Sequence, residues 1–398
     1  MMMNKETFFK DSREDCAGPL EGLLVVEAAS TWAGPLAAML LGDHGASVIK
    51  IEDALGDVGR RIPPMLPDIN PPLSFVHATV NRNKRSVSLD LHDAADQNRL
   101  LQLLDHADVF IHGFRPGVLD KWGLGYESVH ERCPRLVYVS ISGYGQYGVN
   151  ANRAGYDPIA QAASGFMHMN GAVDGPPNKA PTFLGDDLAG LHAALSTMAA
   201  LWHRQKHNEG QHIDIALADS ILLHTNGMLT LGAMGVPYPK FGNRFTFAAP
   251  VDAYRCRDGY VYAGVLLDAH WKVLARLLGR PELGEDPDYL GANRIERREV
   301  VESIMSEWLA DQTVAEAIDI FVDAGLPISP INDLEQAARD PQINERDMLQ
   351  EVDYADGQRV PVAAAPAKLS RTPLTLRQGA PSRPGEHTDE VLREFGID

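Results

Sequence analysis

The chain has few cysteines, no long apolar run and too few basic residues to balance its acidic ones. Its three cysteines, Cys16, Cys133 and Cys256, lie far apart and form no CxxC pair. This spacing argues against a disulfide framework and a zinc cluster, and favours a reducing, cytoplasmic setting. No run reaches 18 apolar residues, so we expect no membrane span. With 36 Lys and Arg against 54 Asp and Glu, the formal net charge of −18 argues against binding to nucleic acid or anionic membranes.

Alternating strand and helix patterns are abundant. Residues 22–30 and 46–53 have the character of buried strands, and residues 33–45 between them have the character of a helix, with Pro35 in its first turn. A strand, a helix and a strand in about 30 residues predict a βαβ unit, and therefore parallel strands. The alternation continues to about residue 229, which predicts an α/β fold with a large, doubly wound, Rossmann-like domain.

The pattern changes after about residue 230. Residues 242–266 resemble a hairpin with its turn at 257–259, and helical patterns follow, which predicts a smaller α+β domain. The polar N-terminus lacks the apolar core of a signal peptide. The expected organisation is a flexible tail at 1–19, a large domain at 20–229, a small domain at 230–340 and a C-terminal segment at 341–398 that returns to the large domain.

Several common catalytic motifs are absent or weak. The segment GYGQYG at 143–148 matches GxGxxG and follows a predicted strand, but residues 149–153 do not open a clear helix. A dinucleotide would therefore lack the helix N-terminus that normally binds its pyrophosphate. The sequence contains no GxxxxGK[ST], HExxH or GxSxG, which weakens the case for a P-loop enzyme, a zinc protease or a serine hydrolase.

Two neighbouring carboxylates, Asp186 and Asp187, stand at the start of a long Ala- and Leu-rich helix predicted at 186–205. Considered alone, an aspartate there is expected to cap the helix, because it accepts backbone N–H groups and interacts favourably with the helix dipole. The surrounding sequence favours a catalytic role instead.

The chain resembles the family III CoA-transferases, which share their fold with the α-methylacyl-CoA racemases. The resemblance extends from about residue 20 to 398, and its motifs are specific when they occur together in this order. They are AGPLAAMLLGDHGASVIKIE (33–52), NRNKRSVSLDL (81–91), GFRPGVLDKWGLGYE (113–127), SISGYGQYG (140–148), GYDPIAQAASGFM (155–167), LGDDLAG (184–190), GQHIDIALAD (210–219) and PGEHTDEVL (384–392).

The resemblance implies that Asp186, the aspartate of the family's LGD step, is the catalytic nucleophile. Its carboxylate would attack an acyl-CoA thioester, forming first an aspartyl anhydride and then an aspartyl-CoA thioester, before CoA passes to an acceptor acid. A carboxylate suits this chemistry because every step exchanges one carboxyl-derived acyl group for another. CoA is then a substrate, and no metal or redox cofactor is needed.

An acidic protein needs local basic and aromatic groups to hold the phosphates and adenine of CoA. The resemblance points to the loop at 113–122 for these groups, and to residues after the first strand and at the GY step for contacts near the thioester. The basic run at 82–85 is a further candidate for the phosphates, or else a solvated turn before a strand. The predicted CoA contacts are Arg115, Lys121, Trp122, Phe114, Arg85, Lys84, Tyr144, Thr31 and Trp32.

Two departures from the relatives bear on the reaction. The racemases use the His of a GHD step as a base, whereas this chain has Tyr156 before Asp157, and tyrosine with a pKa near 10 is a poor base at neutral pH. Asp157 itself is expected to cap the helical segment that follows it. The run of glycines that forms a lid in formyl-CoA transferases is missing at 241–250, where Arg244 could instead bind the far carboxylate of a diacid such as succinate.

The predicted function is transfer of CoA from an acyl-CoA, with succinyl-CoA as one candidate donor, to a free carboxylic acid. Three alternatives stay open: an acyl-CoA racemase, an isomerase that moves CoA within one diacid, and a non-catalytic CoA-binding partner subunit. The resemblance also implies an interlocked homodimer, and allows a heteromer with a paralogous subunit.

Overall fold

The computed structural model describes residues 3–13 and 15–398. The chain forms two compact units. The larger comprises the residues up to Phe166 together with Lys179–Val236 and Pro341–Asp398, and the smaller comprises Met167–Asn178 and Pro237–Asp340. The larger unit therefore draws on three separate stretches of the chain. The smaller unit includes Met167–Asn178, a stretch that lies within the large domain expected from the sequence.

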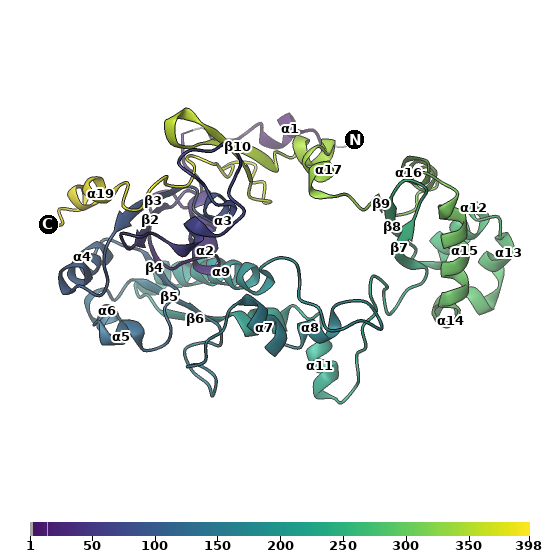
Figure 1. Ribbon diagram of the computed structural model, residues 1–398, viewed down its shortest axis with the longest axis horizontal. Coiled ribbons are helices and arrows are strands. Elements are labelled where there is room, and N and C mark those ends of the chain that lie inside the picture. The colour runs from purple at the N-terminus through teal and green to yellow at the C-terminus, as the bar shows by residue number, and fades with distance from the viewer. Residues whose placement is uncertain (1–2, 14) are drawn as a thin grey trace. The chain divides into compact units, whose positions relative to one another are not determined.

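A six-stranded parallel sheet is the centre of the larger unit (Figure 1). Its order is β3-β2-β1-β4-β5-β6, and every neighbouring pair is parallel. The predicted α/β fold with parallel strands is confirmed. The order reverses between β1 and β4, so the loops after these two strands diverge to opposite sides and leave room for a ligand. The strands are β1 (Leu24–Ala28), β2 (Ser47–Glu52), β3 (Lys84–Ser88), β4 (Val109–His112), β5 (Val137–Ser142) and β6 (His212–Ala216).

The central strands are apolar on both faces, because helices cover both. Successive residues of β1 alternate between two buried clusters, with Val25 in one and Val26 in the other. On the Val25 face lie α2 (Ala33–Asp43) and the long α9 (Leu184–His207), and on the Val26 face lie α4 (Ala94–Leu104), α6 (Tyr126–Arg132) and α19 (Thr388–Glu394). This two-sided burial explains why the strands are continuous apolar runs in the sequence.

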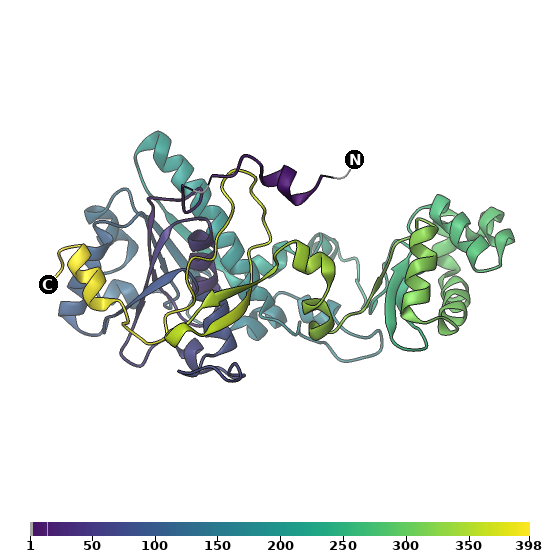
Figure 2. The same cartoon turned by 90° about the horizontal axis from the view of Figure 1, so that it is seen from above.

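The C-terminal segment packs along the β3 side of the sheet. Figure 2 shows the yellow C-terminal segment running beside the purple N-terminal elements. Asn83, just before β3, accepts the backbone N–H of Arg377 through Oδ1 at 2.7 Å, and the backbone N–H of His387 donates to the Ser86 carbonyl at 2.9 Å. These contacts attach the C-terminal segment to the larger unit.

The N-terminal region contains regular structure where a flexible tail was expected. Residues Lys5–Phe9 form helix α1, and the Asn4 side chain caps it by accepting the Thr7 N–H at 2.8 Å. The backbone N–H of Arg13 also donates to the Arg371 carbonyl at 2.8 Å. Residues 1–2 and 14 of the expected tail lie outside the described residues.

Short elements complete the larger unit. They are the 3₁₀ turns η1 (Val58–Arg61) and η3 (Ala355–Gly357), the helices α3 (Phe75–Val80), α5 (Val118–Lys121), α7 (Asp157–Ala163), α10 (Leu217–Leu223), α11 (Met228–Ala233) and α18 (Pro341–Glu345), and the antiparallel pair β10 (Leu349–Asp353) and β11 (Arg359–Ala363). Helix α8 (Phe166–Met169) crosses from this unit into the smaller one.

The smaller unit is an antiparallel sheet packed against helices. The expected hairpin is present, with its turn between β7 (Val251–Arg255) and β8 (Tyr260–Gly264), and β9 (Ile328–Pro330) adds a third strand. Its core includes the fully buried Trp271 and Phe321. The other elements are α12 (Asp268–Leu277), α13 (Pro281–Glu285), η2 (Pro287–Tyr289), α14 (Gly291–Glu296), α15 (Arg298–Ala310), α16 (Val314–Asp323) and α17 (Leu334–Ala338).

Candidate active site

A cavity of about 490 Å³ lies at the carboxyl ends of β1, β4 and β5 and at the start of α9. It is therefore at the point where the strand order reverses, the usual ligand site of open α/β sheets. Of the residues predicted from the sequence, Thr31, Trp32, Arg115 and Asp186 line it together. These residues come from three segments far apart in the chain, and the parallel sheet brings them to one edge.

Asp186 stands in the first turn of α9, and a second carboxylate fixes the start of that helix. Asp157 is almost fully buried, and its Oδ1 accepts the backbone N–H of Gly185 at 2.6 Å. Its Oδ2 accepts a hydrogen bond from the Gln161 side chain at 2.7 Å. Asp157 was expected to cap the helix that follows it. Its carboxylate bonds to that helix only through the Gln161 side chain, and the helix terminus that it caps is that of α9.

The environment of Asp186 favours its protonated form. Burial is the main cause and the negative charges of Asp157 and Asp187 add to it, so the pKa of this carboxyl rises to about 7. At neutral pH a substantial fraction is therefore ionised but poorly hydrated. A carboxylate with little hydration at a helix N-terminus is well placed to attack a thioester carbonyl.

Asp187 has a different role. The indole Nε1 of Trp32 donates to Asp187 Oδ1 at 2.7 Å, and the Trp32 ring packs edge-on against Phe183 with centroids 5.1 Å apart. Burial raises the pKa of Asp187, while the hydrogen bond from Trp32 opposes that shift. The carboxylate of Asp187 is thus engaged in holding the aromatic wall of the cavity.

Thr31, which lines the same cavity as Asp186, has an uncommon backbone conformation. Its φ of 70° lies in the left-handed region, which a β-branched residue rarely adopts. The Thr31 N–H donates to Asp57 Oδ1 at 2.9 Å, and Asp57 in turn pairs with the buried Lys50 at 2.9 Å. Such conformations persist only where the surroundings enforce them, and they concentrate at functional sites.

A second cavity, of about 340 Å³, adjoins the first at the carboxyl ends of β1 to β4. The two share Ala29, Ser30 and Gly113 in their linings. The predicted Phe114 and Trp122 line the second cavity, and their rings pack edge-on with centroids 5.5 Å apart. Arg115 follows Phe114 in the loop that borders both cavities. The predicted aromatic pair is thus brought together, next to the cavity of Asp186.

Lys84 and Arg85, the first two residues of β3, line neither cavity. Lys84 is fully buried, and its ammonium group bonds to Glu27 Oε2 at 3.0 Å, to the Pro35 carbonyl at 2.8 Å and to Asn81 Oδ1 at 3.0 Å. Burial lowers the pKa of Lys84 to about 8, with the charge of Glu27 opposing the shift. Arg85 pairs with Glu390 and Glu394 of α19. Both cations therefore neutralise carboxylates of the fold, and neither lines a cavity in which it could contact the phosphates of CoA.

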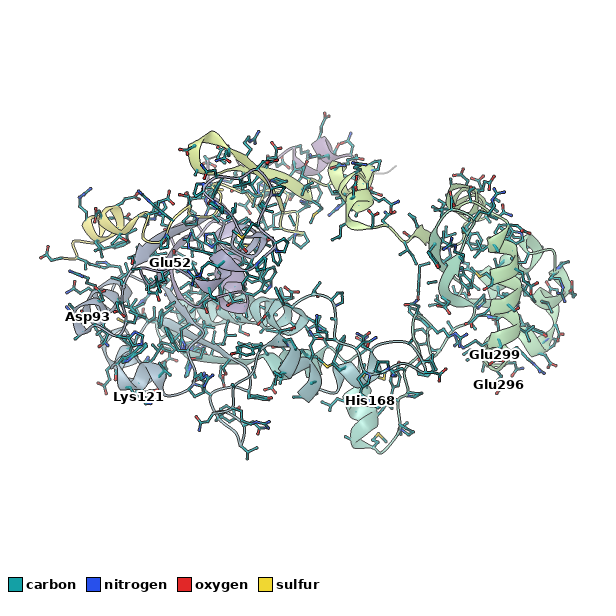
Figure 3. All side chains as sticks on the ribbon, viewed as in Figure 1. Glu52, Asp93, Lys121, His168, Glu296 and Glu299 are labelled. Carbon is teal, nitrogen blue, oxygen red and sulfur yellow. The ribbon has the colours of Figure 1, made fainter. Side chains whose placement is uncertain are left out.

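Two further predicted residues lie outside the two cavity linings. Lys121 is exposed at the end of α5, and Figure 3 places it at the periphery of the larger unit, on a different element from Glu52 of β2. Tyr144 is half-buried after β5, and the guanidinium of Arg153 lies 5.8 Å from its ring centroid. Arg153 itself lines the Asp186 cavity. No motif marks Arg153 in the sequence beyond its place in the loop after the Gly-rich segment.

Arg244, considered above as a carboxylate receptor, belongs to the smaller unit and is already balanced by acidic groups. Its Nη2 lies 2.9 Å from Glu302 Oε2 and its Nε lies 3.4 Å from Asp252 Oδ2. It lines a cavity of about 620 Å³ within that unit, together with residues 170–174. A guanidinium with two carboxylate partners has little remaining charge to offer a ligand.

Comparisons with known proteins decide the family. The sequence profile of CoA-transferase family III matches residues 20–388. The chain belongs to CoA-transferase family III. It is 33% identical to a succinyl-CoA:mesaconate CoA-transferase of Haloarcula hispanica, over 96% of this chain and 97% of that protein. It is 34% identical to a succinate–glutarate CoA-transferase of Agrobacterium fabrum, over 95% and 96% respectively. A solved CAIB/BAIF family protein from Brucella suis superposes with a TM-score of 0.85 at 32% identity, covering 95% of this chain and all of that one.

The resemblance found in the sequence is thereby confirmed, and so is the prediction that this family III member is a CoA-transferase. Two further findings concern the described residues only. Among them, no group of three or more His, Cys, Asp and Glu side chains could hold a metal ion, and no helix is long and apolar enough to cross a membrane. The three cysteines, all within the described range, are free.

Proposed function

We propose that Asp186 is the nucleophile through which this CoA-transferase moves CoA between carboxylic acids. The observation that carries the proposal is a carboxylate of raised pKa, at the start of a helix, in a cavity at the point where the strand order reverses. Its neighbour Asp187 is engaged by Trp32, and Asp157 is engaged by Gly185 and Gln161. Asp186 is therefore the carboxylate of the three that is available to react.

The proposed reaction balances in four steps. The Asp186 carboxylate attacks the thioester carbonyl, the C–S bond breaks, and CoA leaves as a thiolate while a mixed anhydride forms. The thiolate attacks the aspartyl carbonyl of this anhydride, which releases the donor acid and leaves an aspartyl-CoA thioester. The acceptor carboxylate attacks that thioester, which expels the thiolate and forms a second anhydride. The thiolate then takes the acceptor acyl group and frees Asp186.

We place the nucleotide end of CoA in the second cavity and the thioester in the first. The pair Phe114 and Trp122 offers apolar faces for the adenine ring. Arg115 lines the first cavity and follows Phe114 of the second, so it is near the path that the pyrophosphate would take, and Lys121 precedes Trp122 in the chain. Thr31, Trp32 and Tyr144 are proposed to surround the acyl end.

For the substrates, we propose succinyl-CoA as a donor and a dicarboxylic acid as the acceptor. The two relatives described above carry names with succinyl or succinate donors and dicarboxylic partners. A racemase is disfavoured because the residue at the position of the racemase base is Tyr156, which is 72% exposed. Among the described residues, no side chain forms a hydrogen bond with its phenol that would activate it as a base.

The proposed nucleophile can be tested by trapping. The protein is mixed with a panel of acyl-CoAs, quenched with hydroxylamine, digested and analysed by peptide mass spectrometry. We expect a hydroxamate mass change on Asp186, absent in Asp186→Asn, and still present on Asp186 in Asp187→Asn. A mass change on Asp187 would keep the mechanism and reassign the residue. Absence of any modification with a panel that binds the protein would contradict covalent transfer.

A further inference from the structure

Two arginine side chains, Arg115 and Arg153, line the cavity that contains Asp186. Over the described ranges 3–13 and 15–398, neither forms an ion pair with an acidic side chain. Both side chains are exposed at the cavity, in a chain with 18 more acidic than basic residues. Guanidinium groups that line a cavity without an ion-pair partner can bind an anionic group of the substrate.

The two arginines come from different loops of the larger unit. Arg115 is in the loop after β4, whose Gly113 lines both cavities and whose Phe114 lines the second one. Arg153 is in the segment between β5 and α7, and it lines only the Asp186 cavity. It precedes Asp157, which holds the start of α9, by four residues. Arg115 is therefore placed for the CoA side, and Arg153 for the acyl side.

Two contacts orient the guanidinium of Arg153 and leave most of its N–H donors available for hydrogen bonding. It lies 5.8 Å from the ring centroid of Tyr144, within the range of a cation–π contact, and its Nη1 donates to Asn150 Oδ1 at 3.3 Å. A guanidinium has five N–H donors in a planar fork, and that bond uses one. The remaining donors suit a carboxylate, which accepts two parallel hydrogen bonds from such a fork.

We infer that Arg153 binds the carboxylate of the acyl chain that is remote from the thioester, and so makes the enzyme selective for dicarboxylic substrates. The inference rests on the proposed function, because it assumes that the acyl group is at Asp186. It assigns to Arg153 the role that the sequence suggested for Arg244, whose charge is balanced by Glu302 and Asp252 in the smaller unit.

The test compares substrates that differ only in the remote charge. The values of kcat/KM are measured for succinyl-CoA against butyryl-CoA, and for glutaryl-CoA against pentanoyl-CoA, and the ratio within each pair is the readout. The variants are Arg153→Ala, Arg153→Lys and Arg244→Ala. The matched control is Arg135→Ala, because Arg135 is exposed and lines neither cavity.

We expect the wild-type protein to prefer the dicarboxylic member of each pair. Arg153→Ala should lower that ratio by roughly 10- to 100-fold, the range for losing a hydrogen-bonded charge pair, and Arg153→Lys should restore part of it. Arg244→Ala and Arg135→Ala should leave the ratio unchanged.

Three results would overturn the inference. A wild-type protein without preference for diacids is one. An Arg153→Ala variant that loses activity equally with both members of a pair is another, since it would place Arg153 on the phosphates of CoA. A ratio that falls in Arg244→Ala but not in Arg153→Ala is the third. None of these outcomes affects trapping of Asp186, which tests the proposed function separately.

Discussion

At the scale of single residues, the site concentrates three carboxylates, of which two are engaged. Both carboxylate oxygens of Asp157 accept hydrogen bonds, from the Gly185 N–H and the Gln161 side chain. Asp187 accepts a hydrogen bond from the indole N–H of Trp32. Asp186 is left with burial and two negative neighbours, which raise its pKa to about 7. Ionising this carboxylate in the folded protein is therefore unfavourable, and the function we propose for Asp186 has a cost in stability.

That cost can be measured through Asp186→Asn. The carboxyl has a folded-state pKa of about 7 and an ordinary value of 3.8, so the folded wild-type protein binds the proton more tightly than the unfolded chain. Stability then falls as pH rises from about 4 to about 7, and the full cost is present above pH 7. Asn carries no charge, so we expect Asp186→Asn to be more stable than wild type by about 1–3 kcal/mol at pH 8 and by much less at pH 4.

Urea denaturation at the two pH values gives this comparison directly. The control is Asp219→Asn, an exposed aspartate in the first turn of α10, for which we expect no pH-dependent gain. An Asp186→Asn variant that is equally stable or less stable at pH 8 would mean that the carboxylate is better solvated or better paired than its burial indicates.

Some residues of the site could be predicted from the sequence and others could not. Asp186 and Arg115 could be predicted because motifs mark their positions, and the structure brings them to one cavity. The prediction that Lys84 contacts CoA relied on its position beside Arg85 in a polar run, which is typical of an exposed lysine. In the structure, Lys84 is buried and pairs with Glu27 of a different strand. Arg153 could not be predicted, because its place beside Tyr144 and in the lining of the Asp186 cavity depends on the folded structure and on no local pattern.

At the scale of elements, the packing of α2 against α9 determines where Asp186 sits. Gly190 of α9 faces the start of α2, and a Cβ at this position would lie 2.8 Å from the Ala33 carbonyl oxygen and 3.0 Å from Leu36 Cδ2. Small residues therefore allow the two helices to approach closely. The helix was predictable from its composition and length, but the partner that requires the glycine was not.

This close approach predicts that Gly190→Ala is destabilising, although alanine is the better helix former by about 1 kcal/mol. The backbone of α2 would have to shift, and we expect a net loss of about 1–3 kcal/mol in the free energy of unfolding. Gly232→Ala in α11 is the matched control, because no atom lies within 4 Å of the added Cβ, and it should be neutral or slightly stabilising. Equal stability of the two variants by urea denaturation would show that α2 and α9 adjust freely.

At the scale of the whole molecule, α9 leaves one of its faces uncovered. Leu191, Leu195, Met198 and Trp202 are spaced as one face of a helix, and they are 50%, 63%, 40% and 61% exposed. A contiguous apolar stripe of this kind marks a protein interface more often than open surface. The resemblance to the family supports a second copy of this chain as its partner, and we propose that this stripe lies in the homodimer interface.

The proposal predicts a solution mass of twice 43.5 kDa by light scattering after size exclusion. The double variant Leu191→Lys/Leu195→Lys should shift the protein towards monomer, because burying two lysines in an apolar contact leaves their charges unpaired. Glu299→Lys, on an exposed position of α15, is the control and should remain dimeric. A monomeric wild-type chain would contradict the homodimer and direct attention to a paralogous partner. A double variant that stays dimeric would place the interface on another face, since an apolar stripe at a contact cannot accept two charges without a measurable loss of affinity.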